Sequence, residues 1–151
     1  MQHDTLELLI SIGHYARVHR RFDEARYLFG RLALLYPRRA FPYLGLGLIE
    51  LDRANYPSAA LLFGRALEAV PDSVLARAWL GVCQVLEGHY ALGARMLMTV
   101  ADSDQPGATS MAAAFLKLPE CAPFAAARVA QVEPTAASLS TIERLTIRNG
   151  Y

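Results

Sequence analysis

Small, aromatic and large apolar residues recur along the chain at a fixed interval of 34 positions. Several independent columns share this period without slippage, which chance alignment rarely produces. Internal repeats of this length are typical of architectures in which one supersecondary unit stacks on the next. The matching positions are Ile12, Leu46 and Leu80; Gly13, Gly47 and Gly81; Phe22, Tyr56 and Tyr90; Ala25, Ala59 and Gly93; and Phe29, Phe63 and Leu97.

The repeating unit has the length and the residue types of a pair of helices. Such a unit holds two helices of roughly 12–14 residues and two short turns. We expect the glycines on the first helix and the alanines on the second to let the two helices approach closely. We expect Phe22 to open a second helix, and Pro37 and Pro71 to mark the turns between units, because proline cannot continue a helix. The third unit has Gln105 in the proline register.

The pattern resembles the tetratricopeptide repeat, or TPR. The resemblance covers residues 6–39, 40–73 and 74–107, about two-thirds of the chain. It implies an all-α fold, a TPR-type α-solenoid of three helix-turn-helix repeats. The small residue expected late in the second helix is replaced by Leu32 in the first unit and by Val100 in the third. These changes suggest altered packing at the ends of the array.

Residues 108–151 are expected to continue as helices. An alanine-rich stretch, 108–118, ends before a proline, and further helices are predicted over 123–132 and 138–148, the last with a serine at a plausible N-cap. Because terminal repeats need a more polar outer face, we expect part of this extension to cap the solenoid. The chain, residues 1–151, is thus predicted to form a single TPR domain with a C-terminal helical extension.

The composition is that of a globular protein without a strong electrostatic field. The chain has 151 residues, of which 54% are hydrophobic and 19% charged, and its net charge is +1. These values exclude a disordered tail and give no general attraction to nucleic acid or membranes. Asp4 and Glu7 stand where a signal peptide would need its apolar core. Cys83 and Cys121 are too few for a disulfide framework, so we expect a soluble cytoplasmic protein.

The sequence shows no catalytic, cofactor-binding or metal-binding constellation. The four histidines include no pair at i,i+4 spacing, and with the two cysteines they give no metal-ligand spacing. No Ser, Thr or Cys nucleophile comes with an identifiable base. Residues 45–47 lack the strand and the third glycine of a dinucleotide motif. The basic patches at 17–21 and 38–39 are interpreted as solvated turns. We expect a binding protein with no enzyme activity, no cofactor, and no nucleic-acid or membrane partner.

The TPR resemblance also implies which residues line the concave groove. In TPR arrays, the second, fifth, ninth, twelfth and thirteenth positions of each unit look into this groove. The second and third units carry almost only apolar residues there, and an exposed apolar stripe marks a partner site. The ligand should be an apolar extended segment or an amphipathic helix. The predicted partner-binding residues are Ile10, His14, Arg17, Phe41, Leu44, Leu48, Leu51, Leu75, Val82 and Val85.

Two alternatives about this groove remain open at the level of sequence. We expect His14 and Arg17 to orient the polar rim of a partner. The groove is alternatively filled by the protein's own C-terminal helices, with Phe124 and Val129 as the contacting residues. Trp79 is either a packing residue between repeats or an exposed anchor for a partner.

A small TPR chain with an apolar groove and no catalytic group resembles the type III secretion chaperones of bacteria. One branch of these chaperones binds a short extended segment of a translocator protein in the groove, and another holds the amphipathic C-terminal helix of the needle subunit. Translocator chaperones carry a sizeable helical segment before the first repeat, whereas only residues 1–5 precede it here. That difference favours the needle branch or a related export chaperone.

The type III secretion resemblance implies a protein partner, a secreted needle or translocator subunit, and allows a small co-chaperone as a second partner. The alternative is a general TPR scaffold or regulatory adaptor with no role in secretion. The sequence leaves the oligomeric state open.

Overall fold

The structure is a computed structural model that describes residues 2–126. Within this range the chain forms helices and turns only, which confirms the predicted all-α fold. No helix in the range has the length and apolar character that crossing a bilayer requires. The helices are α1 (Gln2–Val18), α2 (Phe22–Leu35), α3 (Phe41–Asp52), α4 (Tyr56–Ala69), α5 (Val74–Leu86), α6 (Tyr90–Ala101) and α7 (Pro106–Leu116).

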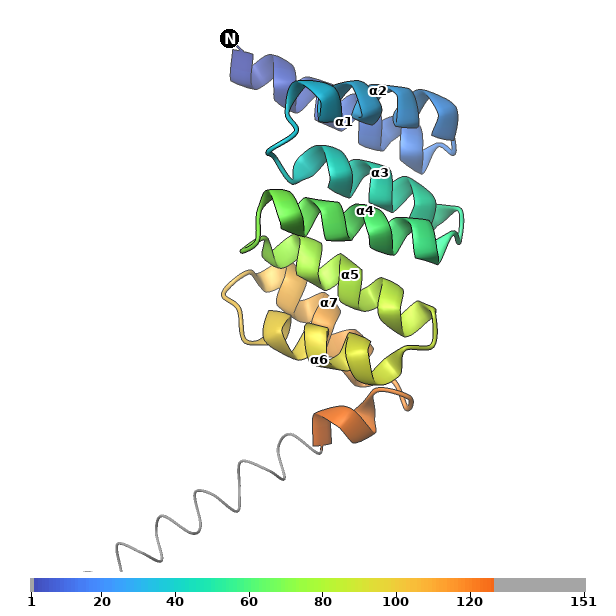
Figure 1. Ribbon diagram of the computed structural model, residues 1–151, viewed down its shortest axis with the longest axis vertical. Helices are drawn as coiled ribbons and strands as arrows, with labels where there is room; N and C mark the ends of the chain where they lie inside the picture. The colour runs from blue at the N-terminus through green and yellow to red at the C-terminus, as the bar shows by residue number, and fades with distance from the viewer. Residues whose placement is uncertain (1, 127–151) are drawn as a thin grey trace, which may run out of the picture.

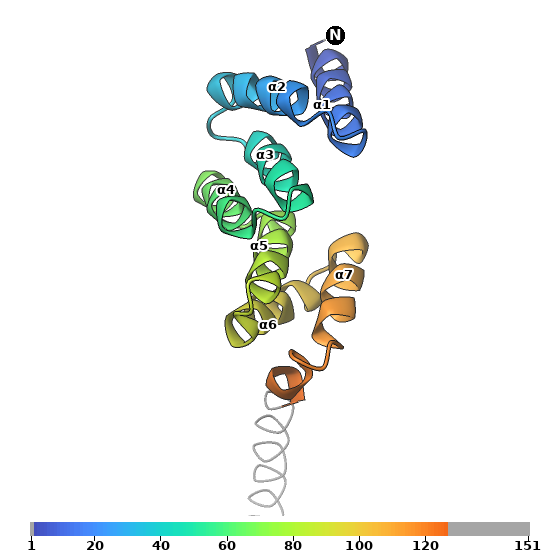
Figure 2. The ribbon, with the colours of Figure 1, turned by 90° about the vertical axis from the view of Figure 1, so that its right-hand side faces the viewer.

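The helices stack as neighbouring pairs along the long axis of the molecule (Figure 1). Helix α1 packs against α2, α3 against α4, and α5 against α6, and each pair also contacts the next. Figure 2 shows α2 and α4 on one side of the stack, α1 and α7 projecting to the other side at its two ends, and α3 and α5 between them. The row of first helices is therefore curved, as in a TPR-type α-solenoid.

The second helix of each pair begins at the aromatic residue predicted to open it. Helices α2, α4 and α6 start at Phe22, Tyr56 and Tyr90. Helix α1 extends further toward the N-terminus than the first predicted unit, because it begins at Gln2. The short turns between the paired helices place them antiparallel, so each pair is a helix-turn-helix hairpin.

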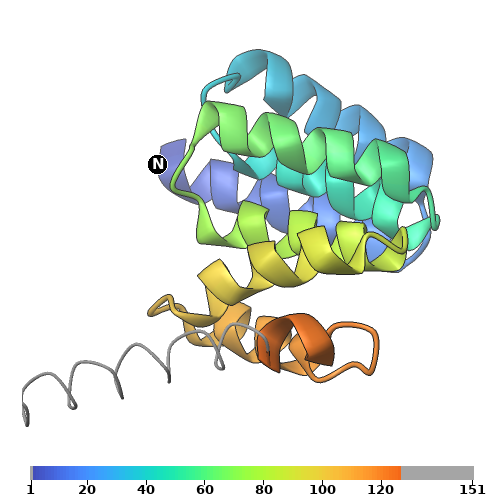
Figure 3. The same ribbon diagram turned by 60° about the horizontal axis from the view of Figure 1, so that its bottom comes forward.

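The C-terminal extension begins with α7, which starts at Pro106 and so lies two residues earlier than the predicted helix over 108–118. A proline suits the first turn of a helix, where its missing N–H has no partner to lose. Figure 3 shows α7 and the helical residues that follow it at the end of the stack. The predicted helix over 123–132 lies only partly within the described residues, and the one over 138–148 lies outside them.

Two buried aromatic rings explain the glycine column of the repeat. A Cβ atom at Gly13 would lie 2.7 Å from the ring of Phe29, and one at Gly47 would lie 2.5 Å from the ring of Phe63. Both rings are fully buried. Gly45 meets Phe29 from the other side, where a Cβ would lie 2.4 Å from the ring. The first helices therefore pack directly onto the rings of the second helices, and the glycines make this approach sterically allowed.

The turns inside the three helix pairs share one backbone feature. Arg20, Ala54 and Gly88 occupy equivalent positions of the repeat and have φ values of 60°, 58° and 87°. This left-handed conformation costs a residue with a Cβ atom free energy that glycine does not pay. Only the third turn uses glycine, so the first two turns hold a strained residue.

The buried core continues from the repeats into the C-terminal extension. Leu32 and Val100, which replace small residues of the TPR pattern, are both buried and fill the ends of the array. The core around α5 and α6 also includes Ala108 and Ala112 of α7 and the side chain of Cys121. Helix α7 is thus part of the folded body.

Candidate partner-binding face

We call the concave side of the row α1, α3 and α5 the inner face; α1 and α7, at the two ends of the stack, both stand out on this side (Figure 2). The candidate site lies on this face. Its central element is α3, on which Phe41, Leu44, Leu48 and Leu51 follow one another at intervals of three or four residues. Side chains at this spacing lie along one stripe of a helix. All four are half-buried, so each retains apolar surface that a partner can cover.

The residues of the stripe are held in place by the core beneath them. Phe41 packs against the cluster that contains Phe29, and Leu44, Leu48 and Leu51 pack against the cluster that contains Phe63. Their positions are therefore fixed before a partner arrives, and binding would cost little side-chain ordering.

Two further predicted residues extend the apolar surface to the neighbouring units. Ile10 on α1 is half-buried, and Leu75 on α5 is exposed. Together with the α3 stripe, they leave accessible apolar side chains on all three first helices. The role of these residues in binding stays a prediction.

Val82 and Val85 are buried, whereas residues that line a groove must be accessible to a partner. Their side chains are only 2% and 5% exposed, and they belong to the core cluster that contains Ala108 and Ala112 of α7. Helix α7 packs against both α5 and α6 and covers this part of the third unit. Both valines therefore belong to the core and are not part of the proposed site, so the prediction that they line the groove is wrong.

The protein's own C-terminal extension fills part of the predicted groove. Helix α7 covers the third unit only. Phe124 is exposed and lines a pocket of about 500 Å³ with residues 88–92, at the turn before α6. Val129 lies outside the described residues. Within the described chain, the stripe on α3 keeps its accessible surface.

One end of the inner face is closed by polar side chains from two units. The Nη1 atom of Arg17 lies 2.7 Å from Oδ2 of Asp52, and its Nε donates a hydrogen bond of 3.4 Å to Nδ1 of His14. The ring of His14 also rests against Phe29, with ring centroids 5.0 Å apart. Arg17 therefore joins α1 to α3, and its charge is already neutralised before a partner binds.

The environment of His14 favours the neutral ring. Burial lowers the pKa of His14, and the nearby charge of Arg17 lowers it further, while the charge of Asp52 acts in the opposite direction. A neutral imidazole has one nitrogen that accepts a hydrogen bond, and Nδ1 fills this role toward Arg17. His14 thus contributes a neutral polar group to the face.

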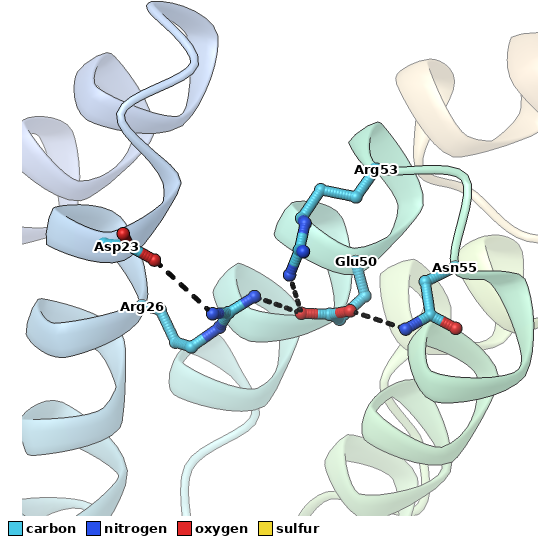
Figure 4. Close-up of polar contacts among 5 residues, drawn as sticks. All are labelled: Asp23, Arg26, Glu50, Arg53 and Asn55. Carbon is cyan, nitrogen blue, oxygen red and sulfur yellow. Dashed lines mark hydrogen bonds and ion pairs between the residues drawn. The ribbon is translucent and has the colours of Figure 1, made fainter.

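A second network, which the sequence pattern did not predict, is centred on the buried carboxylate of Glu50 (Figure 4). Its Oε1 lies 2.8 Å from Nη2 of Arg26 on α2, and its Oε2 accepts a 3.0 Å hydrogen bond from Asn55. Arg53 and Asp23 approach the ends of the network at 3.7 Å. The available signal was an acidic residue inside the otherwise apolar sequence of α3. Like Arg17 and Asp52, this network joins the first unit to the second.

The remaining residues with chemical potential have packing roles. Trp79 stacks on Phe63, with ring centroids 6.2 Å apart, so it is a packing residue between units. Burial raises the pKa of the Cys83 thiol to about 12, with a further contribution from Glu87. Such a thiol stays protonated at neutral pH and is a poor nucleophile. Within residues 2–126, no group of three His, Cys, Asp or Glu side chains is placed to hold a metal ion.

The sequence matches no protein-family profile and no curated protein. Solved structures do resemble the fold. The type III secretion translocator chaperone SycD of Yersinia enterocolitica superposes with a TM-score of 0.62 at 19% identity, over 76% of this chain and 86% of that chain. SycD in complex with a peptide of the translocator YopD gives a TM-score of 0.62 at 20% identity, over 74% and 92%.

A third neighbour is a type III secretion complex from Aeromonas hydrophila, with a TM-score of 0.63 at 20% identity, over 74% of this chain and 76% of that chain. These neighbours share the stacked helical hairpins described above, at identities that establish a common fold. The chain therefore has the TPR-like fold of the type III secretion translocator chaperones.

Proposed function

We propose that this protein is a chaperone that sequesters an apolar or amphipathic segment of a partner protein on its inner face, in the service of type III secretion. The observation that carries the proposal is the half-buried stripe Phe41, Leu44, Leu48 and Leu51, presented on a fold shared with translocator chaperones. The partner is a secreted translocator or needle subunit. One of the structural neighbours is described as a complex with a translocator peptide, which supports the translocator class.

The proposed mechanism is sequestration without chemistry. A partner's apolar side chains complete the burial of the stripe, and each Å² removed from water contributes about 25 cal/mol. The covered segment is then unavailable for premature self-assembly in the cytoplasm. The protein acts as a binding module and not as an enzyme, because its function needs only an apolar surface of fixed shape.

His14, Arg17 and Asp52 define where the bound segment ends. Their mutual contacts leave little unsatisfied charge at this end of the inner face. A charged residue of the partner would meet no free counter-ion there, so the segment that lies on the stripe should be uncharged. Ile10 and Leu75 then receive the apolar side chains on either side of α3.

The experiment starts with affinity capture from the native host, run with wild type and with Leu48→Glu. A charge at this position has no partner beneath a bound apolar segment and should abolish capture. Leu61→Glu is the matched control, because Leu61 lies on α4 and is 65% exposed. A secreted translocator or needle protein captured by wild type and by Leu61→Glu, but not by Leu48→Glu, supports the proposal.

A scaffold or regulatory adaptor without a role in secretion is the second candidate. The observation in its favour is that α7 covers part of the third unit, while Arg20, Arg38 and Arg39 are exposed at the turns. Salt separates the two functions. Binding through the arginines weakens as ions screen it, whereas binding to the apolar stripe does not. Salt-sensitive capture that Leu48→Glu leaves intact would favour the adaptor.

A further inference from the structure

The α3 stripe stays open to water within the described residues. Figure 2 shows α1 and α7 at the two ends of the inner face, and no described helix lies opposite α3. Leu44 and Leu48, at the centre of the stripe, are only half-buried, so part of each side chain meets solvent. A continuous apolar surface is costly to leave in water. The surface therefore favours an occupant also when no partner is bound.

The chain itself carries a segment of the matching pattern beyond the described residues. In the helix that the sequence predicts over 138–148, three apolar residues follow one another at intervals of three and would share one side of the helix. They are Leu139, Ile142 and Leu145. The opposite side would carry Ser140, Arg144 and Arg148, with Glu143 at the border between the two sides. The segment 138–148 thus has the amphipathic character that suits a helix bound in an apolar groove.

The connection between the folded body and this segment is long enough to reach α3. The described chain ends at residue 126, after α7. Residues 127–137 span up to about 40 Å when extended, at about 3.5 Å per residue. Helix α7 packs on α5, α5 on α4, and α4 on α3. Packed helices lie roughly 8–10 Å apart, so these three steps amount to about 24–30 Å. The segment can therefore reach the stripe of its own chain.

Charge and position distinguish the α3 stripe from the other exposed apolar residues. Tyr27 and Leu34 on α2 are 71% and 75% exposed, but the exposed Arg31 stands between them along the helix. A segment with two arginines of its own would bring like charges together there. Helix α3 contains no basic residue. The exposed apolar residues of α1 lie at the opposite end of the stack from residue 126 (Figure 1). The α3 stripe is therefore the best match for the segment.

We propose that residues 138–148 dock on the α3 stripe of their own chain when no partner is bound, and that a partner displaces them. The proposal rests on the proposed function, because it assigns a second occupant to the face that binds the partner. A short linker gives an effective concentration of about 1 mM, so an affinity of only about 0.1 mM covers the stripe in about nine of ten molecules. The partner then binds about tenfold more weakly than it would bind an open stripe.

A spin label on the segment tests the contact directly in the full chain. Both native cysteines are buried, so a nitroxide reagent labels only the thiol that Ser140→Cys introduces on the polar side of the segment. Heteronuclear NMR is expected to show the amide signals of Leu44 and Leu48 broadened relative to the sample with reduced label. Adding Ile142→Glu should restore both signals, because the new charge has no partner on the apolar stripe. Arg144→Glu, on the polar side, is the matched control and should keep the broadening.

A synthetic peptide of residues 135–151 tests the occupancy of the stripe without any partner protein. In fluorescence anisotropy, the labelled peptide is expected to bind the full-length Ile142→Glu variant about tenfold more tightly than wild type, because the variant leaves the stripe open. Adding Leu48→Glu to this variant should abolish binding of the peptide. Arg144→Glu should bind the peptide as weakly as wild type does.

The contrary results separate this proposal from the proposed function. Unbroadened signals of Leu44 and Leu48 overturn it, as does a peptide that binds wild type and Ile142→Glu equally. Broadening found only between a labelled and an unlabelled copy in a mixture overturns docking within one chain. Capture of a secreted protein that Leu48→Glu abolishes, without any line broadening, keeps the proposed function and overturns the inference. A segment that binds the stripe while no secreted protein is captured overturns the proposed function alone.

Discussion

The guanidinium of Arg17 on α1 lies 2.7 Å from the carboxylate of Asp52 on α3, so an ion pair joins the first and second helical units at the inner face. The Arg26–Glu50 pair, 2.8 Å apart, joins the same two units through α2. The contact between the second and third units includes stacked aromatic rings and apolar side chains, Trp79 on Phe63 among them. Buried apolar side chains also join the first two units, so the two ion pairs add a polar contribution at that junction.

Loss of the Glu50 carboxylate should destabilise the fold more than loss of the Asp52 carboxylate. Glu50 is buried and accepts from both Arg26 and Asn55, whereas Asp52 is partly exposed. We expect Glu50→Ala to lower the free energy of unfolding by about 2 kcal/mol, within the range for a buried group that leaves its partners unpaired. Asp52→Ala should cost less than about 1 kcal/mol. Urea unfolding measures the free energy of unfolding of both variants. Equal decreases for Glu50→Ala and Asp52→Ala would contradict this prediction.

The environment of His14 should make the fold less stable in mild acid. Because burial and Arg17 lower its pKa, the unfolded chain binds a proton at a pH where the folded chain does not. The stability that the neutral ring contributes is present above the ordinary histidine pKa of about 6.5 and is lost as the pH falls below it. His14→Gln removes this titration. Between about pH 8 and pH 5, wild type should therefore lose more stability than the variant in urea unfolding, and parallel losses would contradict this.

The strained turns offer a stabilising substitution. Ala54 has a φ of 58°, which glycine adopts without a steric penalty. Ala54→Gly should raise the free energy of unfolding by about 1 kcal/mol. Gly88→Ala introduces the same strain in the third turn, where φ is 87°, and should lower it by a similar amount. Thermal or urea unfolding shows whether each substitution raises or lowers the free energy of unfolding. A lower value for Ala54→Gly than for wild type would refute the interpretation.

Much of the fold follows from the repeat because each column of the pattern has one packing role. Phe29 and Phe63 occupy equivalent positions and fill equivalent spaces against Gly13 and Gly47, so a period in the sequence becomes a period in space. The 34-residue period therefore predicts only the contacts that repeat from one unit to the next. The helix boundaries followed from the same columns, since the aromatic residue at the start of each second helix marks its first turn.

The contacts that break the repeat could not be predicted from it. Helix α7 is rich in alanine and carries no charged residue, so its sequence predicts burial but does not identify Val82 and Val85 as the residues that it covers. The Arg17–Asp52 pair joins residues far apart in the chain that the TPR pattern treats as separate groove positions. Glu50 was the available exception, because an acid within an otherwise apolar stretch of helix predicts a polar partner nearby.

The close approach of paired helices predicts opposite effects for two glycine substitutions. A methyl group at Gly47 would lie 2.5 Å from the ring of Phe63, whereas one at Gly64 on α4 would meet nothing within 4 Å. We expect Gly47→Ala to lower the free energy of unfolding by about 1–3 kcal/mol through overpacking. Gly64→Ala should raise it by roughly 0.5–1 kcal/mol, because alanine is the better helix former. Equal changes in the free energy of unfolding for the two variants would show that the ring of Phe63 shifts aside without a cost in free energy.

The most direct test of the central claim is the affinity of the captured partner's apolar segment, as a synthetic peptide, for wild type and for Leu48→Glu, measured by titration calorimetry. Circular dichroism of each variant establishes that it is folded. The account predicts an affinity for Leu48→Glu at least about 30-fold below wild type, equivalent to about 2 kcal/mol, and an unchanged affinity for Leu61→Glu. A folded Leu48→Glu variant that binds the peptide as tightly as wild type would contradict the assignment of the inner face as the partner-binding surface.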